Sequence, residues 1–372
     1  MISFTPNPKV DTVQLLVLCL FRIIQMKKHS ATVSTQSPIV VNVYRGPMVE
    51  CQHMVNAVVS DASGNILKKW GNTEKPVYLR SAIKLLQSVP LIESGAADAF
   101  DLTDKELSLS CASHTGEPIH VAAVTAWLQK MGLTLDALEC GAHWPTFPEA
   151  AYALAAEGKK PTAAHNNCSG KHAGFLTTAL HLGEDLKGYI HLDHPVQKRL
   201  VKVLEDFTDL DLAEAPVGID GCSIPTIGIP LSGAALAIAR FANPERLPDE
   251  RAAACRRLQN AIATEPEMIA GSDRLCTALN RSAKGAVVAK TGAEGVYLAA
   301  LPNLGLGVAV KNIDGTTRGA EVALGQILQD LGVMTEEMHR EIDAFVKPVQ
   351  KNWNNITVGH MNVQADEQKG SN

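Results

Sequence analysis

A serine and a lysine three residues apart are the first pair in this sequence that could do chemistry. Ser81 and Lys84 belong to the tetrapeptide S-A-I-K, and an i to i+3 spacing puts both side chains on one face of a helix. A neutral lysine amine can take the proton of a serine hydroxyl, and burial lowers the pKa of lysine enough for that role. Chance alone yields roughly one S-x-x-K in such a chain. This motif by itself therefore favours an ordinary amphipathic helix with a surface lysine.

A second motif, K-T-G at residues 290–292, ends an apolar stretch typical of a strand. Chance yields only about 0.1 such tripeptides in this composition. Between the two motifs, Ser113 follows an alternating apolar and polar segment, residues 108–112, which predicts a strand that exits into a loop. S-x-x-K, a loop serine and K-T-G follow one another in serine β-lactamases and penicillin-binding proteins. The order indicates a nucleophilic serine, amine bases and an oxyanion site at a strand edge.

Two observations argue against a penicillin-type enzyme. The middle element is S-H-T at residues 113–115, where those enzymes have S-D-N. In addition, the apolar run at residues 15–21 is too short to span a bilayer and is followed by no clear cleavage site. We therefore expect a cytoplasmic protein that does not bind a membrane.

A third group of residues suggests a metal or a carboxylate ligand. The segment N-N-C-S-G-K-H at residues 166–172 precedes and opens a predicted helix, and G-I-D-G-C-S follows at residues 218–223. Cys168 and Cys222, with a nearby histidine or aspartate, could bind zinc, and buried inert thiols are the alternative. Lys171 would be an unusual ligand because it must first lose its proton. A helix N-terminus preceded by glycine and asparagine also suits a carboxylate.

The elements that must position these residues form a simple order. Strands are predicted near both ends of the chain, and helices fill the middle, which favours an α/β (α+β) fold with an antiparallel sheet from both chain ends and a helical insertion. The expected strands are residues 39–44, 56–60, 65–70, 285–290, 295–301, 305–311 and 353–363, and the first expected helix is residues 81–94.

The composition excludes several classes of protein. The 372 residues carry a net charge of −5 and 46% hydrophobic residues, so the chain is neither disordered nor an evident nucleic-acid binder. Its 8 cysteines are spread along a long chain, which is typical of reduced thiols rather than of a disulfide framework.

Taken together, the motifs resemble those of the rhizobial-type (class 3) L-asparaginases, within the asparaginase II family. The resemblance runs from about residue 38 to the region of Trp353, and H-N-N-C-S-G-K-H at residues 165–172 is its most specific part. The other matching segments are residues 45–50, 58–71, 80–84, 113–117, 218–222 and 289–295. We therefore expect an N-terminal extension over residues 1–37 that is disordered, a single catalytic domain over residues 38–363 and a frayed tail over residues 364–372.

The resemblance implies a serine β-lactamase/glutaminase-like fold, a homodimer and two Ser-Lys tandems. Carried onto this sequence, the tandems are Ser81 with Lys84 and Ser113 with Lys290. The resemblance also implies one zinc ion per subunit that shapes substrate binding rather than activating water. Its ligands would be Cys168, Lys171 and Cys222, and the substrate would be bound by Arg80, His172 and Asp220.

The predicted activity is hydrolysis of L-asparagine to L-aspartate and ammonia by a serine nucleophile that a lysine activates. A glutaminase differs by one methylene in its substrate, which a pocket discriminates by only about 1–3 kcal/mol. A penicillin-interactive serine hydrolase of the same fold is the second alternative, and a binding protein without activity is the third.

Overall fold

The computed structural model describes residues 37–365 of the chain. The expected N-terminal extension over residues 1–37 and the expected tail over residues 364–372 fall almost wholly outside the described residues. Within the described part, no helix combines the length and the apolar character that crossing a membrane requires.

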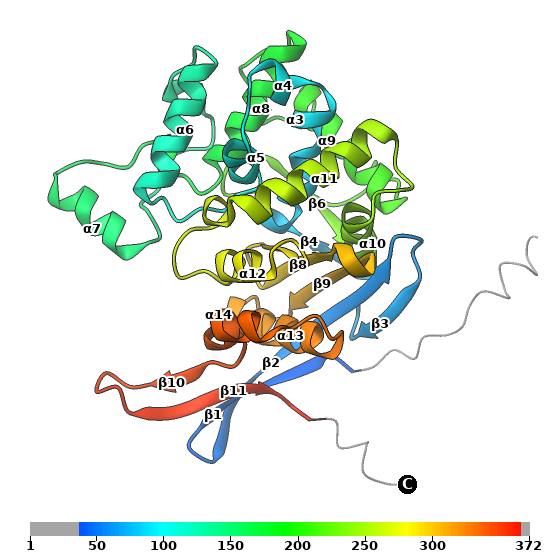
Figure 1. Ribbon diagram of the computed structural model, residues 1–372, viewed down its shortest axis with the longest axis vertical. Helices are drawn as coiled ribbons and strands as arrows, with labels where there is room; N and C mark the ends of the chain where they lie inside the picture. The colour runs from blue at the N-terminus through cyan, green and yellow to red at the C-terminus, as the bar shows by residue number, and fades with distance from the viewer. Residues whose placement is uncertain (1–36, 366–372) are drawn as a thin grey trace, which may run out of the picture. The chain divides into compact units, whose positions relative to one another are not determined.

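A large antiparallel sheet unites the two ends of the described chain (Figure 1). Its strands follow the order β10-β11-β1-β2-β9-β8-β7, and β3 pairs with β2 beside this path. The strands are β1 Ile39–Arg45, β2 Met48–Asp61, β3 Ile66–Trp70, β7 Val288–Thr291, β8 Val296–Leu301, β9 Leu306–Asn312, β10 Val349–Lys351 and β11 Thr357–Val363. N-terminal and C-terminal strands meet where β2 pairs with β9, from Val55 opposite Asn312 to Asp61 opposite Leu306. The predicted fold class is thus confirmed.

Helices cover both faces of this sheet, which is why β8 is buried along its whole length. Gly307 of β9 lies against α10 (Leu231–Ala242), where an added Cβ would come within 2.3 Å of the Ala235 carbonyl oxygen. Only glycine permits this close approach. On the opposite face, α13 (Thr317–Asp330) begins beside His53 of β2, and α14 (Glu336–Val346) packs against α13 (Figure 1). Because side chains alternate between the two faces of a strand, the sheet packs one apolar layer against α10 and another against α13 and α14.

The middle of the chain is helical, as predicted, and holds one small second sheet. That sheet has the order β4-β6-β5, with β4 Pro76–Tyr78, β5 Val217–Ile219 and β6 Pro225–Pro230, none of which the sequence patterns predicted. The remaining α-helices are α2 Lys84–Gln87, α3 Val89–Glu93, α4 Ala96–Ala99, α5 Asp104–Ser110, α6 Pro118–Lys130, α7 Pro148–Ala156, α8 Ser169–Leu182, α9 Pro195–Thr208, α11 Asp249–Thr264 and α12 Leu275–Ala283, and the 3₁₀ turns are η1 Arg80–Ile83, η2 Leu135–Ala137, η3 Ala163–His165, η4 Pro266–Ile269 and η5 Pro302–Leu304.

Three predicted elements need correction. The single helix expected over residues 81–94 is instead η1 followed by the short helices α2 and α3, with proline in the first turn of α3. The segment before Ser113 is the helix α5 rather than a strand, because Thr103 and Glu106 form a capping box that starts it. The strand expected from residue 353 begins only at Thr357, after a turn that connects it to β10.

Candidate active site

Ser81 lies in a turn whose backbone is strained. The preceding residue, Arg80, has φ of +52°, which is uncommon for a residue with a side chain and is often found at functional sites. β4 ends at Tyr78, and η1 then starts at Arg80, so the chain reverses sharply just before Ser81. Gly292 of the K-T-G motif packs directly on this turn, where an added Cβ would lie 2.5 Å from the Leu79 carbonyl oxygen. This glycine therefore lets the end of β7 approach the turn that carries Ser81.

Ser113 sits between two lysine amines. Its Oγ is 3.1 Å from Nζ of Lys84 and 2.8 Å from Nζ of Lys290. All three side chains are buried, so these contacts are made in a medium that strengthens electrostatic interactions. Ser113 and Lys290, which were expected to act as a tandem, are therefore in direct contact. Lys84 contacts Ser113, and no described hydrogen bond involves the Ser81 hydroxyl.

Lys290 is held by the strand β7 and by the residues behind it. Asn280 of α12 donates to the Ala289 carbonyl oxygen at 2.9 Å and accepts from the Ala289 N–H at 2.9 Å, which fixes the register of β7. Burial, with the nearby charge of Lys84 adding to it, lowers the pKa of Lys290 to about 7. At neutral pH a large share of Lys290 therefore carries the free amine that a proton acceptor needs.

The loop that carries Ser113 is anchored on both sides. The N–H of Ser113 donates to Ile269 and that of Thr115 donates to Ala270, each at 2.9 Å. The His114 ring is wholly buried and lies 2.8 Å from Oγ of Ser169, at the start of α8. The loop therefore ties Ser113 to the same helix terminus that carries the cysteine and lysine of the third motif.

Cys168, Lys171 and Cys222, the three expected zinc ligands, lie close together in the interior. Nζ of Lys171 is 3.0 Å from Sγ of Cys222, and Nζ of Lys84 is 3.1 Å from Sγ of Cys168. The pKa of the Cys168 thiol is well below its usual value because the Cys222 thiol donates to it and because two lysine charges outweigh its burial. The two sulfur atoms suit zinc. Burial would lower the pKa of Lys171, but the charges of Cys222 and Cys168 hold it above its usual value, so Lys171 would have to lose a proton to bind the metal. Among the described residues, no group of three His, Cys, Asp or Glu side chains gathers as a metal site.

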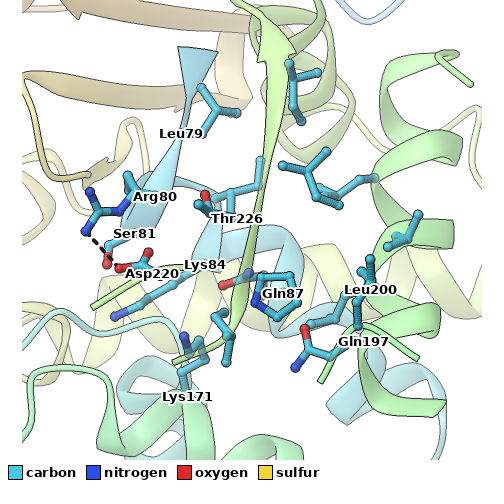
Figure 2. A pocket seen from close by; sticks show the side chains of 18 residues that line it. Leu79, Arg80, Ser81, Lys84, Gln87, Lys171, Gln197, Leu200, Asp220 and Thr226 are labelled. Carbon is cyan, nitrogen blue, oxygen red and sulfur yellow. Dashed lines mark hydrogen bonds and ion pairs between the residues drawn. The ribbon is translucent and has the colours of Figure 1, made fainter. Parts of the chain in front are cut away.

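A pocket brings two of the three predicted substrate-binding residues, Arg80 and Asp220, to Ser81 (Figure 2). Arg80, Ser81, Lys84, Lys171 and Asp220 line it together with residues of α9 and β6. Nη2 of Arg80 donates to Oδ1 of Asp220 at 2.9 Å. Burial would raise the pKa of Asp220, but the hydrogen bond from Arg80 and the charge of Lys171 hold it below its usual range. The described hydrogen bonds to the Asp220 carboxylate use Oδ1 only, so Oδ2 remains open to a ligand.

His172 does not line this pocket, although it is the next residue after Lys171. Its ring is wholly buried, and its pKa is well below the usual value because of burial and the charges of Lys171 and Lys84. Sequence reasoning missed several residues beside the site because no motif marks them. They are Gln87, Gln197 and Thr226 in the pocket, Asn280 behind β7 and Tyr189 beside His172. Only the hydrogen bonds and the pocket walls reveal these five positions.

Solved structures of low sequence identity align with the chain. A structure of Mglu is 14% identical with a TM-score of 0.42, and the alignment covers 75% of this chain and 67% of Mglu. A beta-lactamase from Mycobacterium bovis is 11% identical with a TM-score of 0.40, covering 75% of this chain and 95% of that protein. A putative beta-lactamase from Bacteroides dorei is 12% identical with a TM-score of 0.38, covering 84% of this chain and 98% of that one. The chain thus spans about two thirds of the length of Mglu.

The match to a protein family extends well beyond the individual sequence motifs. No curated protein matches the chain. The model of the family described as L-asparaginase II, in contrast, matches residues 41–363, which is most of the chain and includes every residue of the site. The protein therefore belongs to the L-asparaginase II family and is an amidohydrolase of the asparaginase type.

Proposed function

We propose that this protein hydrolyses the side-chain amide of L-asparagine to give L-aspartate and ammonia. The observation that carries the proposal is the contact of one serine hydroxyl, that of Ser113, with two buried lysine amines beside the pocket that holds Ser81. Such an arrangement supplies a nucleophile, a base and a proton donor within one site. Family membership supports an amide as the bond that is cleaved.

In the first half of the proposed reaction, Oγ of Ser81 attacks the amide carbon. Lys84 accepts the serine proton, and the C–N bond breaks as ammonia leaves. The proton taken from Ser81 passes from Lys84 through Ser113 to Lys290 and then to ammonia, and Lys290 can take it up only as the free amine, which its pKa of about 7 makes available near neutrality. Hydrogen bonds at catalytic serines often tighten only when substrate binds, so a missing Ser81–Lys84 contact is compatible with this step.

In the second half, water attacks the ester between Ser81 and the aspartyl group. Aspartate leaves and the Ser81 hydroxyl regains its proton. The α-ammonium of the substrate binds Asp220, whose Oδ2 is open, while Arg80 holds Oδ1. The α-carboxylate lies toward the start of α8, where a helix N-terminus favours an anion. Backbone N–H groups at Ser81 and beyond Lys290 receive the oxyanion.

We also assign one zinc ion to Cys168, Lys171 and Cys222, supported by the two buried sulfur atoms and the amine described above. When bound, zinc would fix the pocket wall that carries Lys171 and Asp220 and would supply positive charge for substrate binding. Removal of metal by a chelator should raise the KM for asparagine several-fold with a smaller change in kcat. Metal analysis of the same samples provides the control. An unchanged KM after complete metal loss would contradict this role.

A homodimer is proposed as well, supported by the helix α7. None of its nine residues is buried, although the sequence P-E-A-A-Y-A-L-A-A is mostly apolar. Tyr152 is 73% exposed. A second copy of the chain would cover this surface, and Tyr152→Glu should then shift the mass measured by light scattering from dimer to monomer. A monomeric wild type would contradict the proposal. The seven described cysteines are free thiols, which supports a cytoplasmic location.

The experiment that tests the main proposal is ammonia release from L-asparagine. The same enzyme is given L-glutamine and the chromogenic β-lactam nitrocefin at matched concentrations. We expect kcat/KM to be highest for asparagine, lower for glutamine and undetectable for nitrocefin. A higher kcat/KM for glutamine would make the protein a glutaminase, and turnover of nitrocefin would favour the penicillin-interactive alternative. No turnover of any of the three would contradict the proposed function.

A further inference from the structure

A carboxylate outside the pocket joins the loop that carries Ser113 to a distant turn, residues 271–273. Glu117 is half-buried and accepts hydrogen bonds at both of its oxygens. Its Oε1 accepts from the Thr115 hydroxyl at 2.6 Å and from the Ser272 N–H at 2.8 Å. Its Oε2 accepts from the Ser272 hydroxyl at 2.9 Å. One carboxylate therefore connects two segments that lie 155 positions apart in the chain.

The backbone of the turn is shaped to fit this carboxylate. Gly271 has φ of +102° and Asp273 has φ of +55°, and both values are uncommon for residues with a side chain. A Cβ added at Gly271 would come within 2.3 Å of Oε1 of Glu117 and of Oγ1 of Thr115, so only glycine permits this approach. The Gly271 N–H donates to the Thr277 hydroxyl at 3.0 Å. A turn of this kind persists only where surrounding contacts hold it.

The two segments that Glu117 joins support the two partners of the Ser113–Lys290 contact. On one side, the backbone of the Ser113 loop donates to the two residues that precede the turn. On the other side, the turn leads directly into α12, whose Asn280 holds the strand that carries Lys290. The position of the turn therefore affects both Ser113 Oγ and Lys290 Nζ, which are 2.8 Å apart.

Glu117 could act on this contact through its charge or through its reach. Burial alone would raise its pKa, but the hydrogen bonds from Thr115 and Ser272 hold the pKa below its usual value. The ionised carboxylate only accepts hydrogen bonds, which matches the three donors around it. All three of these bonds depend on a side chain long enough to span from one segment to the other.

We propose that Glu117 is a positioning residue, which sets the contact between Ser113 and Lys290 by reaching Ser272. This inference rests on the proposed function, in which Ser113 and Lys290 transfer a proton. Glu117 does not line the pocket that holds Ser81, so its role does not include contact with the substrate. Loss of its reach should therefore slow the chemical step and leave substrate binding unchanged.

Two substitutions separate reach from charge. Glu117→Gln keeps the length and loses the charge, because its amide oxygen can accept at the Oε1 position while its NH₂ group donates to the Ser272 hydroxyl. Glu117→Asp keeps the charge but is one methylene shorter, so it should no longer reach Ser272. We expect Glu117→Asp to lower kcat for asparagine roughly 10- to 100-fold at unchanged KM, because small misplacements of catalytic groups are costly. Glu117→Gln should retain most of the wild-type kcat.

Glu74→Asp is the matched control and should leave kcat unchanged. Glu74 likewise accepts from the hydroxyl of an adjacent threonine, Thr73, and from that of a distant serine, Ser232, at the start of α10. In a Ser113→Ala background, Glu117→Asp should have no further effect on kcat, because the hydroxyl that it positions is gone. Three outcomes would overturn the proposal: an unchanged kcat in Glu117→Asp, an equal loss in both backgrounds, or an impaired Glu117→Gln beside an active Glu117→Asp.

Crystal structures of the same variants test the geometry without turnover. We expect Ser113 Oγ to move away from Lys290 Nζ by roughly 1 Å in Glu117→Asp and to stay in contact with it in Glu117→Gln. Unchanged positions of both atoms in Glu117→Asp would contradict the inference. This comparison needs no substrate, so absence of asparaginase activity in the wild type would contradict the proposed function alone.

Discussion

Ser81 and Ser113 lie in one site and differ in almost every physical respect. Ser81 lines a pocket, follows a strained residue and makes no described side-chain hydrogen bond. Ser113 is 5% exposed and is contacted by two lysine amines. Ser81 has access to a substrate, and Ser113 has the proton-transfer partners.

The difference suggests how the two serines divide the work. A nucleophile must reach the substrate, so it cannot be enclosed on all sides by its own bases. A proton relay, in contrast, gains from burial, because burial lowers the pKa of Lys290 to about 7. We therefore assign attack to the accessible serine and proton transfer to the buried one. Lys84 belongs to the Ser81 motif by sequence and to Ser113 by contact, so it connects the two.

Removal of the Ser81 hydroxyl should cause the largest loss of activity. Ser81→Ala is expected to lower kcat by roughly 10⁴- to 10⁶-fold, because loss of a nucleophile removes the covalent route. Initial rates of ammonia release measure the effect. Ser88→Ala, seven residues farther along, is the control and should retain activity. Near-normal turnover of Ser81→Ala, combined with an inactive Ser113→Ala, would reverse the assignment of the two serines.

Ser113→Ala should have the second largest effect. We expect kcat to fall by roughly 10²- to 10³-fold, the usual contribution of a positioned acid or base, because Ser81 would still attack. A burst of ammonia in rapid-quench experiments would show whether acyl-enzyme formation or its hydrolysis is slowed. A loss as large as that of Ser81→Ala would mean that the two serines act as a single unit.

Asp220→Asn tests whether the pocket that holds Ser81 binds the substrate. Without its charge, the residue should bind the α-ammonium more weakly, and KM should rise roughly 10- to 100-fold with a smaller change in kcat. Asp209→Asn is a matched control, since Asp209 also pairs with an arginine, Arg240, but lies at the surface. A large fall in kcat at unchanged KM would instead assign Asp220 to the chemical step.

The pH dependence of kcat/KM tests proton transfer by Lys290 beside the buried Ser113. Lys290 accepts a proton only as the free amine, and its pKa is lowered to about 7, so the active fraction grows as pH rises through 7. We expect kcat/KM at pH 6 to be roughly one tenth of its plateau above pH 8. Lys290→Arg should abolish this limb of the profile along with most activity, because arginine stays charged. An activity independent of pH between 6 and 8 would exclude Lys290 as the titrating base.

Local patterns predicted the elements that local chemistry controls. The end of β7 at the K-T-G motif and the start of α8 at the N-N-C-S-G-K-H segment are both present. The expected strand before Ser113 was wrong, because alternation over a few residues did not outweigh the capping box at Thr103 and the contact of α5 with neighbouring helices. The prediction of one helix over residues 81–94 was also wrong. The turn at Arg80 packs against Gly292, which lies 212 positions away in the printed sequence, so no local pattern indicates it.

The sequence by itself determined which side chains are available for the chemistry, and it also carries the family match over residues 41–363. Tertiary structure alone decided that Lys84 contacts Ser113, that Asp220 pairs with Arg80 and that the Tyr189 hydroxyl lies beside Nδ1 of His172. Each of these contacts joins segments that are distant along the chain. Hydrogen bonds require donor and acceptor atoms within about 3 Å. Spacing along one segment cannot specify such a distance, because the packing of separate elements against one another sets it.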